Sequence, residues 1–347
     1  MLVFNGERIL LEVYGSILST KYVLTLEQLQ EFFLLEDSSE SITELTRRFC
    51  LQSSSQDIQK KGMEFLYIHG YFDDLKVLIK KNKESEHFSN NQWADIYQIM
   101  MDLKKNRELA FTILPRLNQL KTSDPELVCL IELAKASCYY YMNRVDKLGY
   151  ILATYQQLFS AIDDRLLVSY FRTRIRQISI IYFLKRNEMI TARKFGYQIL
   201  NEMLNPFIHA DIHIKLGLSY TFESLEQGMY HLSEALRISK EYQFDKAVNL
   251  IEQRNIPFLL AHFNQVENIS TQDKSEQAHI EIAKGNNGKA IEILNELPLN
   301  TPFQIYYLGK AKQDKQLLIK SYLYFIEKQG DHFFSKLPLY ELKQLNS

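Results

Sequence analysis

The scarcity of glycine and proline is the feature that most constrains how this chain folds. Its 347 residues include only 12 glycines and 7 prolines, about half the average usage of these two residue types. Few turn residues mean long elements, and long elements in a globular protein are typically helices. The composition therefore predicts an all-α fold. It argues against a β-sandwich, a small barrel or a glycine-rich nucleotide site.

Helical periodicity supports this prediction along the chain. In residues 166–184 the apolar positions recur at offsets of three and four, which places them on one side of a helix. Asp124 followed by Pro125 predicts a helix start, with an N-cap and a proline in the first turn. Thr301 followed by Pro302 predicts a second start of the same kind. Short polar segments, such as 185–188 and 284–289, are turns between helices.

Small residues recur at similar spacings across these polar turns. Each pair sets a small residue in one helix 11 to 13 residues before a small residue in the next, which lets two antiparallel helices approach closely. The pairs are Ser179 with Ala192, Gly217 with Gly228, Ala278 with Ala290, and Gly309 with Ser321. This pattern is typical of tetratricopeptide-like hairpins and predicts a right-handed superhelix of them. A non-repetitive helical bundle remains the alternative.

Charge, cysteine usage and hydropathy limit the environment of the chain. There are 41 basic and 42 acidic side chains, which argues against non-specific coating of nucleic acid by the chain as a whole. The three cysteines form no CxxC pair, so we expect a reducing compartment, with Cys129 and Cys138 buried as small hydrophobic residues. No apolar run is long enough to span a membrane, and no signal peptide is evident. We therefore expect a cytoplasmic protein with no membrane partner.

The inner wall of such a superhelix binds extended peptides or partner helices. If Ser179 packs against the following helix, Arg172 and Arg176 face this wall. The same offsets from Gly309 and Gly217 select Tyr306 and Thr221 as further candidates for peptide binding.

The segment 165–195 is strongly basic, with eight basic side chains and one acidic side chain. Arg172 and Arg176, one helical turn apart, form a candidate site for a carboxylate such as a peptide C-terminus. An exposed face of solvated arginines and contact with a phosphate backbone are the two alternatives.

The motifs of enzymes and of cofactor sites are missing from the sequence. His209 and His213 have a spacing that can hold a metal, but no third ligand lies near them, so we expect no metal site. The sequence contains no G-x-S-x-G elbow, no P-loop and no G-x-G-x-x-G motif. We therefore expect no cofactor and no catalytic residues, and we predict that the protein is not an enzyme.

Several segments, taken in order, resemble the arbitrium receptors (AimR) of temperate Bacillus phages, within the class of Gram-positive intracellular peptide-pheromone receptors. The resemblance covers about residue 40 to the end. It depends on these segments: RFCL at 48–51, NQWADIY at 91–97, LGLSYTFE at 216–223, AIEILNEL at 290–297, YYL at 306–308 and GDHFFSKLPLYEL at 330–342.

This resemblance implies a homodimer of helical repeats that binds a short communication peptide and regulates transcription at a phage locus that controls lysogeny. It also implies that Asp331 and Glu276 are acids that meet the peptide, since a peptide cation needs a fixed carboxylate. The alternatives are an Asp331 that caps a turn and a Glu276 that faces solvent in the first turn of a helix. Leu218 departs from the class, which often has an asparagine there that holds the peptide backbone, so peptide sequence or affinity should differ.

The resemblance also implies an N-terminal DNA-binding head, which residues 1–45 do not match. They carry two basic and eight acidic side chains, the opposite of what phosphate recognition requires. We therefore expect residues 1–45 to be a short helical segment, a truncated or degenerate head, and residues 46–347 to form the peptide-sensing domain with a C-terminal dimerisation region. DNA binding stays open. A Rap-like peptide-responsive regulator that acts on a protein partner, and a helical scaffold without a small ligand, are the alternative functions.

Overall fold

Helices are the only regular elements in the part of the chain that the computed structural model describes, residues 25–35, 42–202 and 205–345. The predicted all-α class is therefore confirmed. The helices are α2 (Leu26–Leu35), α3 (Ile42–Gln52), α4 (Gln56–His69), α5 (Phe72–Lys83), α6 (Phe88–Lys105), the 3-10 turn η1 (Arg107–Leu109), α7 (Ala110–Gln119), α8 (Pro125–Tyr141), α9 (Val145–Ser160), α10 (Arg165–Lys185), α11 (Met189–Leu200), α12 (Pro206–Ser219), α13 (Leu225–Glu241), α14 (Asp245–Leu250), the π-helical turn η2 (Ile251–Asn255), α15 (Ile256–His262), α16 (Lys274–Ala283), α17 (Asn287–Asn295), α18 (Pro302–Lys312), α19 (Lys315–Leu323), the π-helical turn η3 (Tyr324–Lys328) and α20 (Lys336–Gln344).

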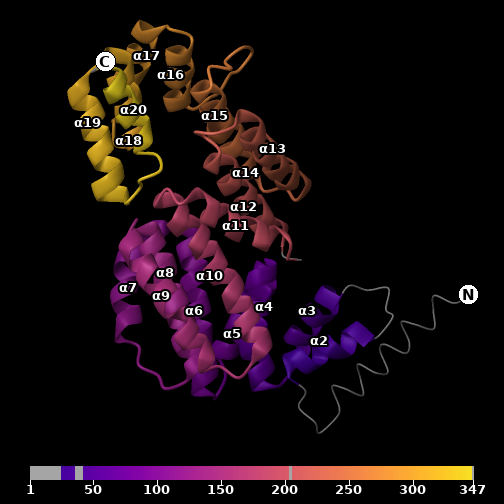
Figure 1. The fold of residues 1–347 in the computed structure, drawn as a ribbon. Helices are drawn as coiled ribbons and strands as arrows, with labels where there is room; N and C mark the ends of the chain where they lie inside the picture. The colour runs from indigo at the N-terminus through magenta and orange to yellow at the C-terminus, as the bar shows by residue number, and fades with distance from the viewer. Residues whose placement is uncertain (1–24, 36–41, 203–204, 346–347) are drawn as a thin grey trace, which may run out of the picture. The chain divides into compact units, whose positions relative to one another are not determined.

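The chain divides into two compact units. Unit 1 comprises residues 1–138 and 154–173, and unit 2 comprises residues 139–153 and 174–347. Within unit 2, helices that follow one another in the chain pack side by side, as α16 to α20 do in Figure 1. This is the packing expected of stacked hairpins. The predicted boundary at residue 45 stays a prediction, because residues 1–24 and 36–41 lie outside the described part.

The predicted helix starts are confirmed. The Asp124 carboxylate accepts hydrogen bonds from the backbone N–H groups of Glu126 and Leu127, at 3.0 and 3.3 Å, at the start of α8. At the start of α18, Thr301 and Gln304 form a reciprocal capping box. Local side-chain chemistry thus sets where these helices begin.

The crossing of α12 and α13 shows why small residues recur across the turns. A Cβ atom placed on Gly217 would lie 2.8 Å from Leu232 Cγ and 3.0 Å from the backbone oxygen of Gly228. The two backbones therefore touch where both helices have glycine. Ala278, Ala290 and Ser321 are likewise completely buried in later hairpins.

Replacing Gly217 with alanine is expected to destabilise unit 2 by about 1–3 kcal/mol, because the added methyl group overpacks a backbone contact that cannot move. Gly288, in α17, is the matched control, since a Cβ there meets nothing within 4 Å. Gly288→Ala should stabilise by up to about 1 kcal/mol through helix propensity. Thermal unfolding followed by circular dichroism measures both variants, and equal midpoints would contradict the close crossing.

Candidate functional site

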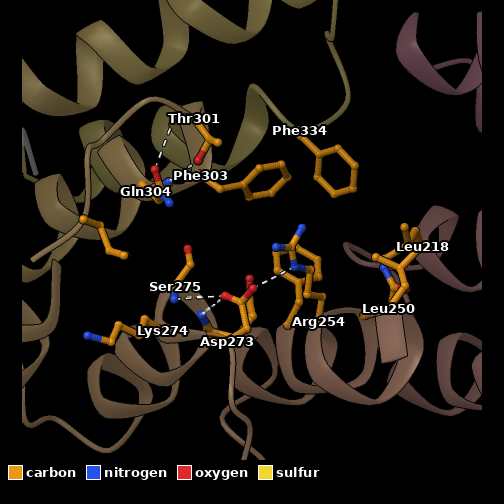
Figure 2. A pocket seen from close by; sticks show the side chains of 14 residues that line it. Leu218, Leu250, Arg254, Asp273, Lys274, Ser275, Thr301, Phe303, Gln304 and Phe334 are labelled. Carbon is orange, nitrogen blue, oxygen red and sulfur yellow. Dashed lines mark hydrogen bonds and ion pairs between the residues drawn. The ribbon is translucent and has the colours of Figure 1, made fainter. Parts of the chain in front are cut away.

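Unit 2 contains a pocket of about 440 Å³, which lies among α12, the turn from α14 to α15, α16, α18 and the segment before α20 (Figure 2). Its volume is within the range of small-ligand sites. The residues that line it are Leu218, Leu250, Arg254, Asn255, Phe258, Asp273, Lys274, Ser275, Glu276, Leu297, Thr301, Phe303, Gln304 and Phe334.

Three phenylalanine rings form one apolar wall of the pocket. Phe258, Phe303 and Phe334 contact one another close to edge-on, with ring centroids 5.1 to 5.8 Å apart. Phe303 and Phe334 lie side by side above Asp273 and Arg254 in Figure 2. Such a wall favours a ligand with apolar side chains.

The opposite wall is formed by the π-helical turn η2. Pro257 lacks the N–H that would bond to the carbonyl of Gln253 in a regular α-helix. The preceding residue, Ile256, donates its N–H to the carbonyl of Ile251, five residues back, whereas an α-helix would use the residue four back. The hydroxyl of Thr271 donates to the Gln253 carbonyl at 2.7 Å, so the freed oxygen is paired. Such turns are rare and frequently occur at functional sites.

An ion pair lies at the mouth of the pocket. Arg254 Nε donates to Asp273 Oδ2 at 2.7 Å, and the arginine side chain is 63% exposed. The other Asp273 oxygen accepts from the backbone N–H groups of Ser275 and Glu276 and caps α16. Both interactions are drawn in Figure 2. Asp273 therefore fixes both the helix start and the arginine head group.

Glu276 forms the buried acidic part of the lining. It is only 8% exposed, and it accepts a hydrogen bond from the Tyr307 hydroxyl at 3.2 Å. Burial, reinforced by the nearby charge of Asp273, raises its pKa to about 8. His279 Nδ1 lies 3.4 Å from the carboxyl group, and burial lowers the pKa of this histidine to about 3. At pH 7 the two groups therefore meet mainly as a neutral acid and a neutral base.

Glu276 lines the pocket, whereas Asp331 and Tyr306 lie outside the lining. The possibility that Glu276 faces solvent is wrong, because the side chain is buried. Asp331 is 7% exposed and accepts from the backbone N–H groups of Phe333 and Phe334 at 3.2 and 2.9 Å. It therefore caps the turn that carries Phe334 into the pocket. Tyr306 is buried in the core cluster of α16 to α20.

The remaining three candidates also lie outside the pocket lining. Thr221 is completely buried, and its hydroxyl donates to the Leu218 carbonyl at 2.7 Å. Arg176 pairs with Glu202. Arg172 is exposed on α10, in unit 1. Thr221 and Arg176, which belong to unit 2 like the pocket, are not among its lining residues. The part of all three candidates in peptide binding stays a prediction.

Most of the pocket was not predicted from the sequence. Arg254, Asn255 and the π-helical turn had no motif that marked them, although Pro257 signals a disturbed helix. Glu276 and Leu218 are exceptions, since both line the pocket. The family resemblance implies Glu276 as a peptide contact and marks Leu218 as a departure from the receptor class. Phe334 lies within the predicted C-terminal motif.

Neither a metal-binding cluster nor a membrane-spanning helix occurs among the residues that the structure describes. There, no group of three or more histidine, cysteine or acidic side chains could hold a metal ion. His213 Nδ1 instead lies 3.0 Å from His231 Nδ1. Cys129 and Cys138 are buried, as predicted. None of the helices in this part of the chain is both long and apolar enough to traverse a bilayer.

Two solved structures share the fold. One, named "Structure of phAimR-Ligand", has a TM-score of 0.74 and 20% sequence identity, and the match covers 94% of this chain and 98% of that chain. The other, "Structure of SeMet-phAimR", has a TM-score of 0.68 and 18% identity, over 97% of this chain and 90% of that chain.

Sequence comparisons agree with this likeness. The AimR transcriptional regulator of Bacillus phage SPbeta is 24% identical over 319 residues, which is 87% of this chain and 80% of that protein. An uncharacterized protein of Bacillus anthracis is 29% identical over 188 residues, 51% of this chain and 69% of that protein. The model of the family described as "AimR transcriptional regulator-like" matches residues 42–344. Since this match spans most of the sequence, the chain belongs to the AimR transcriptional regulator-like family.

Proposed function

We propose that the protein is an intracellular receptor for a short communication peptide and that it regulates the transcription that decides between phage lysis and lysogeny. The membership of the AimR-like family supports the regulatory part, together with a relative that is described as a transcriptional regulator. This relative favours transcriptional control over a Rap-like action on a protein partner. A cytoplasmic location, a homodimer and contact with DNA belong to the same proposal.

The observation that carries the peptide-binding part is the pocket in unit 2. Its apolar wall of three phenylalanines faces a rim with an arginine–aspartate pair, and a buried carboxyl group lies below. A short peptide offers the matching chemistry: apolar side chains, backbone N–H and C=O groups, and charged ends. The fold likeness to a structure named for a ligand agrees with this assignment.

We assign Glu276 and Asp331 different parts in this site. Glu276 can donate a hydrogen bond while it is protonated, or pair with a peptide cation once that cation displaces its proton. Asp331 acts through the turn that it caps, and thereby positions Phe334. We assign the site a binding role without catalysis, in keeping with the membership of the AimR-like family.

The test is binding of a synthetic positional-scanning library of short, unmodified peptides, read by calorimetry with the best member. Phe334→Ala should weaken binding about tenfold or more, because it removes one ring of the apolar wall. The matched control is Phe111→Ala, which truncates an exposed ring in unit 1 and should leave the affinity unchanged. A wild-type protein that binds no library member would contradict the proposed function.

A further inference from the structure

Asn255 has an unusual place in the pocket. It is the last residue of the π-helical turn η2, and it lines the pocket. Its side-chain oxygen is buried and has no hydrogen-bond partner among the described residues. Buried polar atoms in folded proteins are almost always paired, and an unpaired one is costly. A buried, unpaired acceptor beside a ligand-sized cavity therefore points to a donor that comes from outside the chain.

The polar groups next to Asn255 are already engaged with the loop before α16. Arg254 bonds to Asp273. The side-chain oxygen of Gln253 accepts from the backbone N–H of Gln272 at 2.7 Å, and its carbonyl accepts from Thr271. These neighbours thus anchor the turn to the loop before α16, whereas the carboxamide oxygen of Asn255 has no hydrogen-bond partner among the described residues.

The acceptors on the facing wall are also engaged. Thr301 Oγ1 accepts from the backbone N–H of Gln304, and the side-chain oxygen of Gln304 accepts from the backbone N–H groups of Asn300 and Thr301. Leu218, on another wall, has no polar side-chain atom to offer. A ligand N–H that enters the pocket thus finds in Asn255 an acceptor without a competing internal donor.

We infer that the carboxamide oxygen of Asn255 accepts a hydrogen bond from an N–H group of the ligand, a backbone amide or an amine of a peptide, and so contributes to ligand recognition. This inference rests on the proposed function and deepens it. The turn suits this role because a π-helical turn inserts one residue into the helical register and changes which side chain faces the cavity.

The experiment uses the full chain and the best member of the peptide library. Asn255→Leu keeps a similar volume but removes the acceptor, and it should weaken binding about tenfold or more. Asn255→Asp keeps an acceptor and should retain affinity within about threefold of the wild type. Asn295→Leu, the same change at an exposed position of α17, is the control and should leave affinity unchanged.

Thermal unfolding of the ligand-free variants gives an independent readout. Asn255→Leu should unfold at an equal or higher temperature than the wild type, because it removes a buried atom that has no partner. A residue with an internal structural bond would lower that temperature instead, and this result would overturn the inference.

The binding data distinguish a failure of the Asn255 inference from a failure of the proposed function. Unchanged affinity of Asn255→Leu, or equal losses in the Leu and Asp variants, would overturn the inference while the proposed function stands. A wild-type protein that binds no peptide would overturn the proposed function, and this inference with it.

Discussion

Lys61→Met is expected to destabilise unit 1 by about 3 kcal/mol, because it leaves the buried side chain of Asp164, which is only 7% exposed, without its cation. The Lys61 ammonium group lies 2.6 Å from Asp164, 3.0 Å from Asp57 and 3.7 Å from Glu126. Burial alone would lower the pKa of Lys61, but the bonds to Asp164 and Asp57 outweigh it and raise the pKa. Asp164 also caps α10 through the backbone N–H of Leu167, so the network joins three helices.

An exposed ion pair of the same length provides the control. Lys76 lies 2.6 Å from Asp73, but their side chains are 53% and 95% exposed. Lys76→Met should change stability by less than about 1 kcal/mol, since water already screens this pair. Urea unfolding followed by circular dichroism compares the two variants. Similar small effects would show that burial does not strengthen the Lys61 network.

The second large expected effect is a loss of stability with rising pH that is caused by Glu276. The folded protein raises the pKa of this carboxyl group from its ordinary value of 4.5 to about 8. Between these values the folded state keeps a proton that the unfolded state has lost, so stability falls as pH rises. The side chain in Glu276→Gln has no proton to lose. Between pH 5 and pH 8, the free energy of unfolding of this variant should therefore fall by on the order of 3 kcal/mol less than that of the wild type.

Buried histidines have the opposite effect on the pH dependence of stability, so the contribution of Glu276 must be measured by comparing variants. Burial lowers the pKa of His279 to about 3 and that of His262 to about 4. The unfolded state therefore binds more protons at these two sites below pH 6.5, and their contribution to stability rises with pH. Unfolding of the wild type and of Glu276→Gln at several pH values isolates the glutamate as the difference between the two curves.

Glu292→Gln is the matched control for this measurement, because Glu292 is exposed on α17. Its stability should follow that of the wild type at every pH. If the free energy of unfolding changed with pH in the same way in Glu276→Gln and in the wild type, Glu276 would be ionised in the folded protein. That result would contradict the raised pKa that its burial predicts.

The local features of the fold could be predicted because they depend on neighbours in the sequence. The helix starts at Asp124 and Thr301 need only a capping side chain and a following proline. The glycines at 217 and 228 could be recognised because a hairpin brings together residues separated by one turn. Such contacts are set by short spacing, which a single sequence displays directly.

The candidate site could be predicted only in part. Glu276 was reached through the family resemblance, and the structure places it in the pocket lining. Asp331, from the same resemblance, caps a turn. Tyr306 and Thr221 were selected by a helical offset, but the structure buries both outside the lining, because an offset gives the side of a helix and not what covers that side.

The sequence by itself determined the helical class, the hairpin spacing and the family, since helix propensity, capping and small-residue contacts act over short distances along the chain. Only the tertiary structure decided which side chains meet in the pocket. Arg254 and Asn255 lie in a π-helical turn whose Gln253 carbonyl is bound by Thr271, a residue of a separate loop. The pKa of Glu276 is likewise a product of burial by other helices, and burial depends on how distant segments pack together.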